Sequence, residues 1–185
     1  MLTERSLNVM RQYIYNETYL LSDSISKVNS LPKDIYEYIN CYAYALGLIR
    51  PSKNRIYIPG FTTNLLYDEN SKEDLISNIC KDLNNLSIKY TKYGVFDKIK
   101  LKKSEYLVQV LYIPTESFFW PKSDFHFLRK SKNGKWFSKP GWLNQPSFSY
   151  VEPILKFKDE EIVRVHFEGF SRVYIRVGYF AIKEK

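Results

Sequence analysis

The chain has 185 residues and a formal net charge of +8, with 44% apolar, 17% aromatic and 26% charged residues. This balance excludes an intrinsically disordered chain, and no apolar run reaches the roughly 20 residues of a membrane-spanning helix. The length is typical of one domain over residues 1–185 that buries its own core, with residues 1–33 as an N-terminal helical extension.

The N-terminus and the cysteine count both indicate the cellular compartment. The N-terminus lacks the basic start and apolar run of a secretory signal, which favours a cytoplasmic protein or one exported without a signal peptide. Cys41 and Cys80 are too few for a disulfide scaffold, and their spacing indicates no zinc site. We therefore expect free thiols, no metal and no cofactor, while the sequence does not indicate an oligomeric state.

Three helices are predicted in the first half of the chain. Apolar positions at near-helical spacing predict the first over residues 5–21, and a short helical turn is expected at 34–39. The second begins near Cys41 and ends by residues 47–51, because Pro51 cannot continue a helix. The third follows a capping-box-like pair, Ser71 and Asp74. Its apolar stripe comprises Leu75, Ile76, Ile79, Cys80, Leu83 and Leu86.

Strands are predicted beyond Gly94. The expected strands cover residues 105–113, 124–129, 135–138, 161–167 and 173–182. The first of them is almost continuously apolar, as in a central buried strand, and Asn133-Gly134 joins the next two as a hairpin. Helices followed by antiparallel strands predict an α+β fold in which N-terminal helices pack on an antiparallel sheet of about five strands.

The stretch NCYAYAL at 40–46 places a cysteine on the first turn of a helix. Asn40 is a favoured N-cap residue, and the free N–H groups of a helix N-terminus favour a thiolate at Cys41. The backbone N–H of Cys41 could also hold the oxyanion of a tetrahedral intermediate. The alternative interpretation of Cys41 is a buried helix cysteine without chemistry.

His126 is the candidate base. It alternates with Phe125 and Phe127 along its strand and therefore shares a face with Asp124. The alternative interpretation is a structural histidine whose hydrogen bonds are satisfied within the fold. The competing histidine, His166, has no neighbouring turn or aromatic rim that would mark a cleft.

A third residue usually orients the base by accepting its second ring N–H. Asn144 is the first candidate for this role, and Ser138 and Asp124 are the alternatives. Three tryptophans are candidates for substrate binding: Trp120, Trp136 and Trp142.

Four segments together resemble a group of bacterial papain-like cysteine hydrolases. These are NCYAYAL at 40–46, YLV at 106–108, DFHFLR at 124–129 and NGKWFSKPG at 133–141, with a closing strand at 178–180. The group is the CHAP-type and NlpC-type amidase and peptidase branch, in which a helix-borne cysteine precedes a strand-borne histidine. The resemblance implies a papain-like fold with Cys41 as nucleophile and His126 as base. Where the related pattern reads Ser-His-Lys-Pro-Gly, this chain has FSKPG at 137–141, so His126 is the hairpin's one candidate base.

The leading hypothesis is thus a cysteine hydrolase that cleaves an amide or peptide bond through a thioacyl intermediate. The resemblance implies a peptide or protein substrate, of the cell-wall type among others. A transamidase or a deamidase would use the same pair. A non-catalytic binding module is the other alternative, because aromatic residues interleaved with lysine and arginine can bind nucleic acid, although no nucleic-acid fold signature accompanies them. A pseudoenzyme that keeps the fold without turnover is the third.

Overall fold

The structure is a computed structural model that describes residues 39–48, 57–63, 71–114, 124–131, 133–140 and 146–183. The predicted helix at 5–21 and the extension over 1–33 lie outside these ranges, as does the turn at 34–39 apart from Ile39. Asn144, Trp120 and Trp142 also lie outside them. The remaining expectations can be compared with the described residues.

The helical elements are α3 (Cys41–Leu46), a 3-10 turn η2 (Phe61–Thr63) and α4 (Lys72–Asn85). Asn40 caps α3, because its side-chain oxygen accepts from the Ala43 N–H at 2.8 Å. Ser71 caps α4 in the same way, since its hydroxyl accepts from the Asp74 N–H at 3.0 Å. The predicted starts of both helices are confirmed. No described helix has the length and apolar character needed to cross a lipid bilayer.

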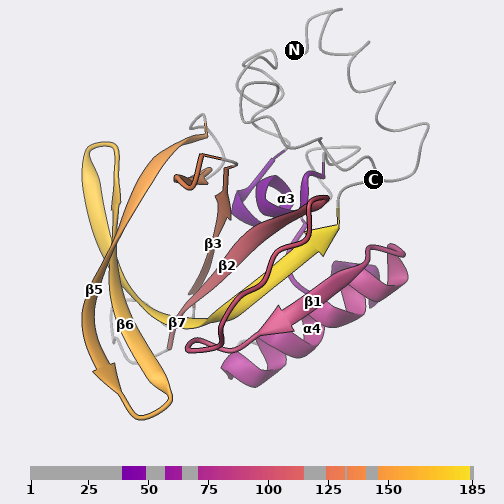
Figure 1. Ribbon diagram of the computed structural model, residues 1–185, viewed down its shortest axis with the longest axis horizontal. Helices are drawn as coiled ribbons and strands as arrows, with labels where there is room; N and C mark the ends of the chain where they lie inside the picture. Colours follow the sequence, from indigo (N-terminus) through magenta and orange to yellow (C-terminus); the bar gives the residue numbers. More distant parts are fainter. Residues whose placement is uncertain are drawn as a thin grey trace, which may run out of the picture.

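The described strands form one antiparallel sheet. They are β1 (Tyr90–Tyr93), β2 (Glu105–Ile113), β3 (Asp124–Lys130), β4 (Trp136–Ser138), β5 (Ser147–Phe157), β6 (Glu160–Phe167) and β7 (Phe170–Lys183). Their order is β1-β7-β2-β3-β4-β5-β6, and β6 pairs in addition with β7. Strands β2 to β7 therefore close on themselves as a barrel, and β1 lies beside β7 outside the ring (Figure 1).

This closure contradicts the predicted papain-like α+β fold, in which N-terminal helices pack on an antiparallel sheet of about five strands. The physical reason is the length of β7, which covers 14 residues and pairs with β6 and β2 in the ring and with β1 outside it. Its first half pairs with β6, with Phe170 opposite Phe167, and its second half pairs with β2, with Lys183 opposite Glu105. The register of β2 and β7 shifts between Val110 and Leu111, and this bulge increases the local bend and twist of the strand.

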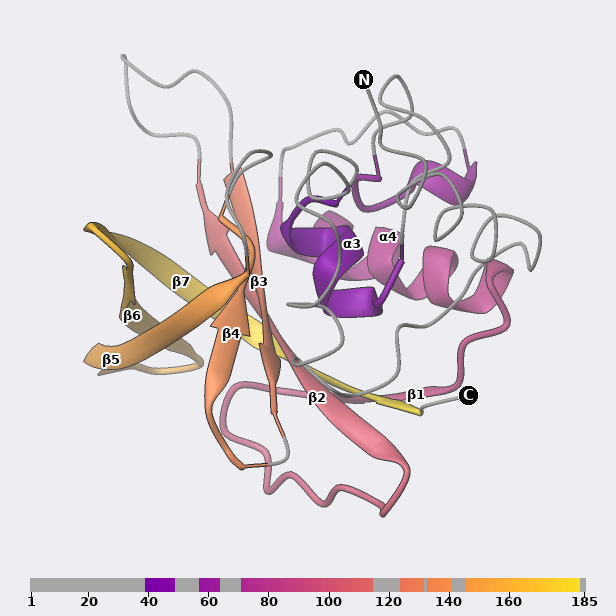
Figure 2. The ribbon, with the colours of Figure 1, turned by 90° about the horizontal axis from the view of Figure 1, so that it is seen from above.

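Two apolar cores lie on opposite faces of β2 and β3. On the outer side of the sheet α3 packs on β3 and α4 lies along β1 and β7, whereas β5 and β6 curve away on the other side (Figure 2). Along β3, Phe127 packs in the core beneath the helices and its neighbour Leu128 packs inside the barrel. Both side chains are almost fully buried, and each contributes about 1.5–3 kcal/mol by leaving water. The predicted alternation on this strand is confirmed, and it places His126 on the barrel side.

Candidate functional site

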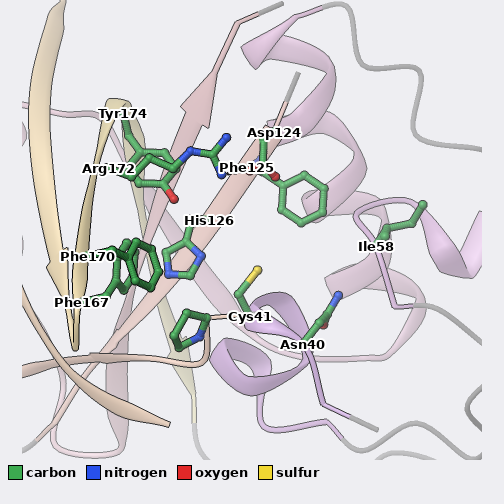
Figure 3. Close-up of a pocket in the computed structure, with 11 residues that line it drawn as sticks. Asn40, Cys41, Ile58, Asp124, Phe125, His126, Phe167, Phe170, Arg172 and Tyr174 are labelled. Carbon is green, nitrogen blue, oxygen red and sulfur yellow. Dashed lines mark hydrogen bonds and ion pairs between the residues drawn. The ribbon is translucent and has the colours of Figure 1, made fainter. Parts of the chain in front are cut away.

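A cavity of about 310 Å³ opens where the start of α3 meets β3 and the β6–β7 hairpin. Cys41 and His126 both line it, and Figure 3 shows the sulfur and the imidazole ring beside one another in the same space. Its lining also includes Asp124, Phe167, Phe170, Arg172 and Tyr174. The structure thus brings together the two residues that the sequence proposes as a catalytic pair.

The cap residue Asn40 holds the first turn of α3 in place. Its Oδ1 accepts from the Ala43 N–H, and its Nδ2 donates to the Tyr57 carbonyl at 2.6 Å. Because both polar atoms of its side chain are engaged, Asn40 has a capping role. The backbone N–H of Cys41 stays the predicted oxyanion donor. Cys41 itself is partly exposed and is a free cysteine.

A buried carboxylate on α4, that of Asp82, also holds the start of α3 in place. The carboxylate of Asp82 on α4 is fully buried and accepts from the Tyr42 hydroxyl at 2.9 Å and the Gly60 N–H at 2.7 Å. It also accepts from the backbone N–H and the hydroxyl of Thr62 at 3.0 and 2.6 Å. Asp82 therefore ties α4 to the residue next to Cys41 and to the loop that precedes η2.

Burial controls the charge of the thiol. It raises the pKa of Cys41 to about 12, and the nearby carboxylate of Asp124 acts in the same direction. Hydrogen bonds from the backbone of Phe127 and Tyr42 and the charge of Lys139 lower this pKa, but they do not offset burial. At neutral pH the resting thiol is protonated. The predicted thiolate at a helix N-terminus is wrong for the resting state, because desolvation outweighs the backbone hydrogen bonds that lower the thiol's pKa.

The imidazole of His126 is buried among aromatic rings. Its ring meets Phe167 edge-to-face at 5.0 Å and stacks on Tyr174 at 5.8 Å between centroids. Burial lowers the pKa of His126 to about 3, and the positive charge of Arg172 acts in the same direction. Within the described residues Nε2 is buried without a hydrogen-bond partner. The ring is therefore neutral at physiological pH.

The residues that could orient His126 are engaged elsewhere. Asp124 forms an ion pair with Arg172 at 2.7 Å and accepts from the Phe125 N–H at 2.9 Å. Ser138 shares a buried hydrogen bond of 2.8 Å with Ser149. Asn144 lies outside the described residues. The described residues thus supply no orienting partner for Nε2.

The other candidates lie away from this cavity. Trp136 stacks at 6.4 Å on Tyr179 and packs against the barrel core, and it does not line the cavity. His166 contacts Glu152 at 3.0 Å on a half-exposed stretch of β6. Cys80 packs against the core beneath the helices, as its place in the apolar stripe predicts.

Sequence reasoning missed the wall that the β6–β7 hairpin contributes. Phe167 and Phe170 flank its turn, and Arg172 and Tyr174 follow on β7. Alternation along 160–167 is visible in the sequence, but no local signal tells that this hairpin faces Cys41. Only the pairing of β7 with both β6 and β2 brings these residues to the site.

No protein-family model matches the chain, and neither a curated protein nor a solved structure matches it. Among the described residues, no group of three or more histidine, cysteine, aspartate or glutamate side chains could hold a metal ion.

Proposed function

We propose that the chain is a cysteine hydrolase that cleaves an amide or peptide bond with Cys41 as nucleophile and His126 as general base. The observation that carries this proposal is that both side chains line one cavity, although 84 residues lie between Cys41 and His126 in the sequence. A nucleophile beside a base in a cleft is the arrangement that covalent acyl transfer requires.

The neutral resting pair sets the order of the chemical steps. Burial opposes a lone thiolate and a lone imidazolium, whereas a thiolate and an imidazolium formed together attract each other in a site of low dielectric constant. The thiol proton therefore passes to His126 as the sulfur attacks the carbonyl carbon. His126 then gives that proton to the leaving amine as the carbon–nitrogen bond breaks and a thioester forms.

Water completes the cycle. His126 takes a proton from the water molecule that attacks the thioester, the carboxylic acid leaves, and the proton returns to the sulfur of Cys41. One amide and one water thus become one acid and one amine. Tyr174 and Phe167, which pack on the imidazole, hold the ring in its orientation through both steps.

The test uses p-nitrophenyl acetate, an activated acyl donor that does not require the natural substrate. We expect a burst of p-nitrophenolate, and mass spectrometry of the digested protein should find the acetyl group on Cys41. Cys41→Ala should abolish the burst, and His126→Gln should slow acylation about 100-fold or more, the usual contribution of a general base.

The matched control is Cys80→Ala, which removes the chain's other cysteine from α4 and should leave the burst unchanged. Circular dichroism should confirm that each variant is folded. An acetyl group found on Cys80 instead, or acylation of His126→Gln at the wild-type rate, would overturn the proposal.

A further inference from the structure

We infer that the substrate carries an aromatic or large aliphatic group on the acyl side of the scissile bond, which packs on Phe167 and Phe170. This inference rests on the proposed function and names the chemical class that the same cavity accepts. The group is uncharged and sits next to the carbonyl that Cys41 attacks.

The two phenylalanines form a flat apolar surface at the β6–β7 turn. They are opposite one another in the strand register, and their rings stack at 4.6 Å between centroids with 24° between planes. Phe167 is 8% exposed, whereas Phe170 is 50% exposed. A large aromatic surface left uncovered at the wall of a cavity is typical of a ligand contact.

This surface lies next to the reacting groups. Phe167 also contacts the His126 ring, so one continuous aromatic wall runs from the imidazole to the mouth of the cavity. Figure 3 shows the imidazole of His126 between the phenylalanine pair and the Cys41 sulfur, with Phe125 on the far side of the sulfur. A group that extends from the attacked carbonyl past the imidazole would therefore meet these rings.

Size and charge narrow the class of this group. About 310 Å³ is close to the lower limit of ligand pockets, so the cavity holds one side-chain-sized group beside the scissile bond. The charged side chains among its described lining residues are Asp124 and Arg172, which neutralise one another at 2.7 Å. A charged group would be desolvated against lining residues that carry no net opposite charge, whereas an apolar group gains by leaving water.

The experiment compares two acyl donors that share a leaving group, p-nitrophenyl acetate and p-nitrophenyl 3-phenylpropanoate. The rate of Cys41 acylation by each is divided by its spontaneous hydrolysis rate. We expect the phenylpropanoyl donor to react about tenfold faster or more, as for an apolar group that gains a specificity pocket. Phe170→Ala should lower the preference for the phenylpropanoyl donor over the acetyl donor about fivefold, and Phe170→Leu should lower it less.

The matched control is Phe148→Ala. Phe148 is also a 50% exposed strand phenylalanine, but it contacts Phe137 and does not line the cavity. Its removal should leave the ratio unchanged. A wild-type ratio near one, or an equal fall in the Phe148 and Phe170 variants, would overturn the inference and leave the hydrolase proposal standing. Acylation of Cys41 by neither donor would overturn both.

Discussion

At the scale of single residues, the positions of Cys41 and His126 and their protonation states have different physical causes. Their cavity follows from the pairing of strands, while their protonation follows from burial, which raises one pKa to about 12 and lowers the other to about 3. Both shifts favour the uncharged form. Cys41 and His126 therefore form no thiolate–imidazolium ion pair at rest, and in the proposed reaction these charges develop only as the sulfur attacks.

This burial makes stability depend on pH through His126. The unfolded chain binds a proton on this ring near pH 6.5, whereas the folded chain does so only near pH 3. Between these values the unfolded state binds more protons, so the free energy of unfolding falls as pH falls, by up to about 1.4 kcal/mol per pH unit. Urea unfolding of the wild type at pH 6.5 and 4.5 measures this loss.

His126→Gln should remove about 2 kcal/mol of the wild-type loss between those two pH values. Phe148→Ala is the control, because it removes a half-exposed side chain that does not titrate and should keep the wild-type pH dependence. The same pH dependence in wild type and His126→Gln would show that the folded protein accepts a proton on His126 as readily as the unfolded chain does.

At the scale of the elements, Gly178 allows β7 to pass close to β1. Its φ is 154°, and a Cβ at this position would lie 2.7 Å from the carbonyl oxygen of Tyr93. Gly178 also stands next to the register shift between β2 and β7. The close approach of backbone to backbone, more than any side-chain contact, requires glycine there.

Gly178→Ala should therefore lower the free energy of unfolding by about 3 kcal/mol, because the obstructing atom is backbone and cannot move aside. Gly134→Ala is the comparison. Gly134 also has a positive φ, of 83°, but an added Cβ there meets no atom within 4 Å, so about 1 kcal/mol is expected. Urea unfolding measures both values, and equal losses would rule out the steric explanation.

At the scale of the whole molecule, closure gives β2 a partner on each side, and the apolar core beneath the helices covers its outer face. β1 pairs with β7 alone among the described strands and lies at the edge of the sheet. Residues of β2 such as Val108 and Val110 are at most 1% exposed, whereas Thr91 and Lys92 on β1 are exposed. Local opening should therefore cost much less at β1 than at β2.

Native-state hydrogen exchange measures this difference. The amides of Val108 and Val110 should exchange about a hundredfold more slowly than the hydrogen-bonded amides of β1. Equal protection of the two strands would mean that the sheet opens as one unit and that β1 is as firmly attached as the barrel.

Much of the local structure could be predicted from sequence. The caps Asn40 and Ser71, the bounds of β2 and the hairpin of β3 and β4 agree with the structure, because each depends on residues close together in the chain. β5 was not predictable in this way. Its apolar residues, such as Tyr150 and Phe157, are exposed, and Pro153 interrupts a pattern that does not alternate.

The sequence by itself determined where helices and most strands begin, and which face of β3 carries His126, since periodicity and capping act over a few residues. Only the tertiary structure decided that β7 closes the sheet, that the β6–β7 hairpin forms a wall beside Cys41, and that thiol and imidazole rest uncharged. These properties depend on long-range strand pairing and on how completely each group is removed from water. Both are sums over contacts between residues far apart in the chain.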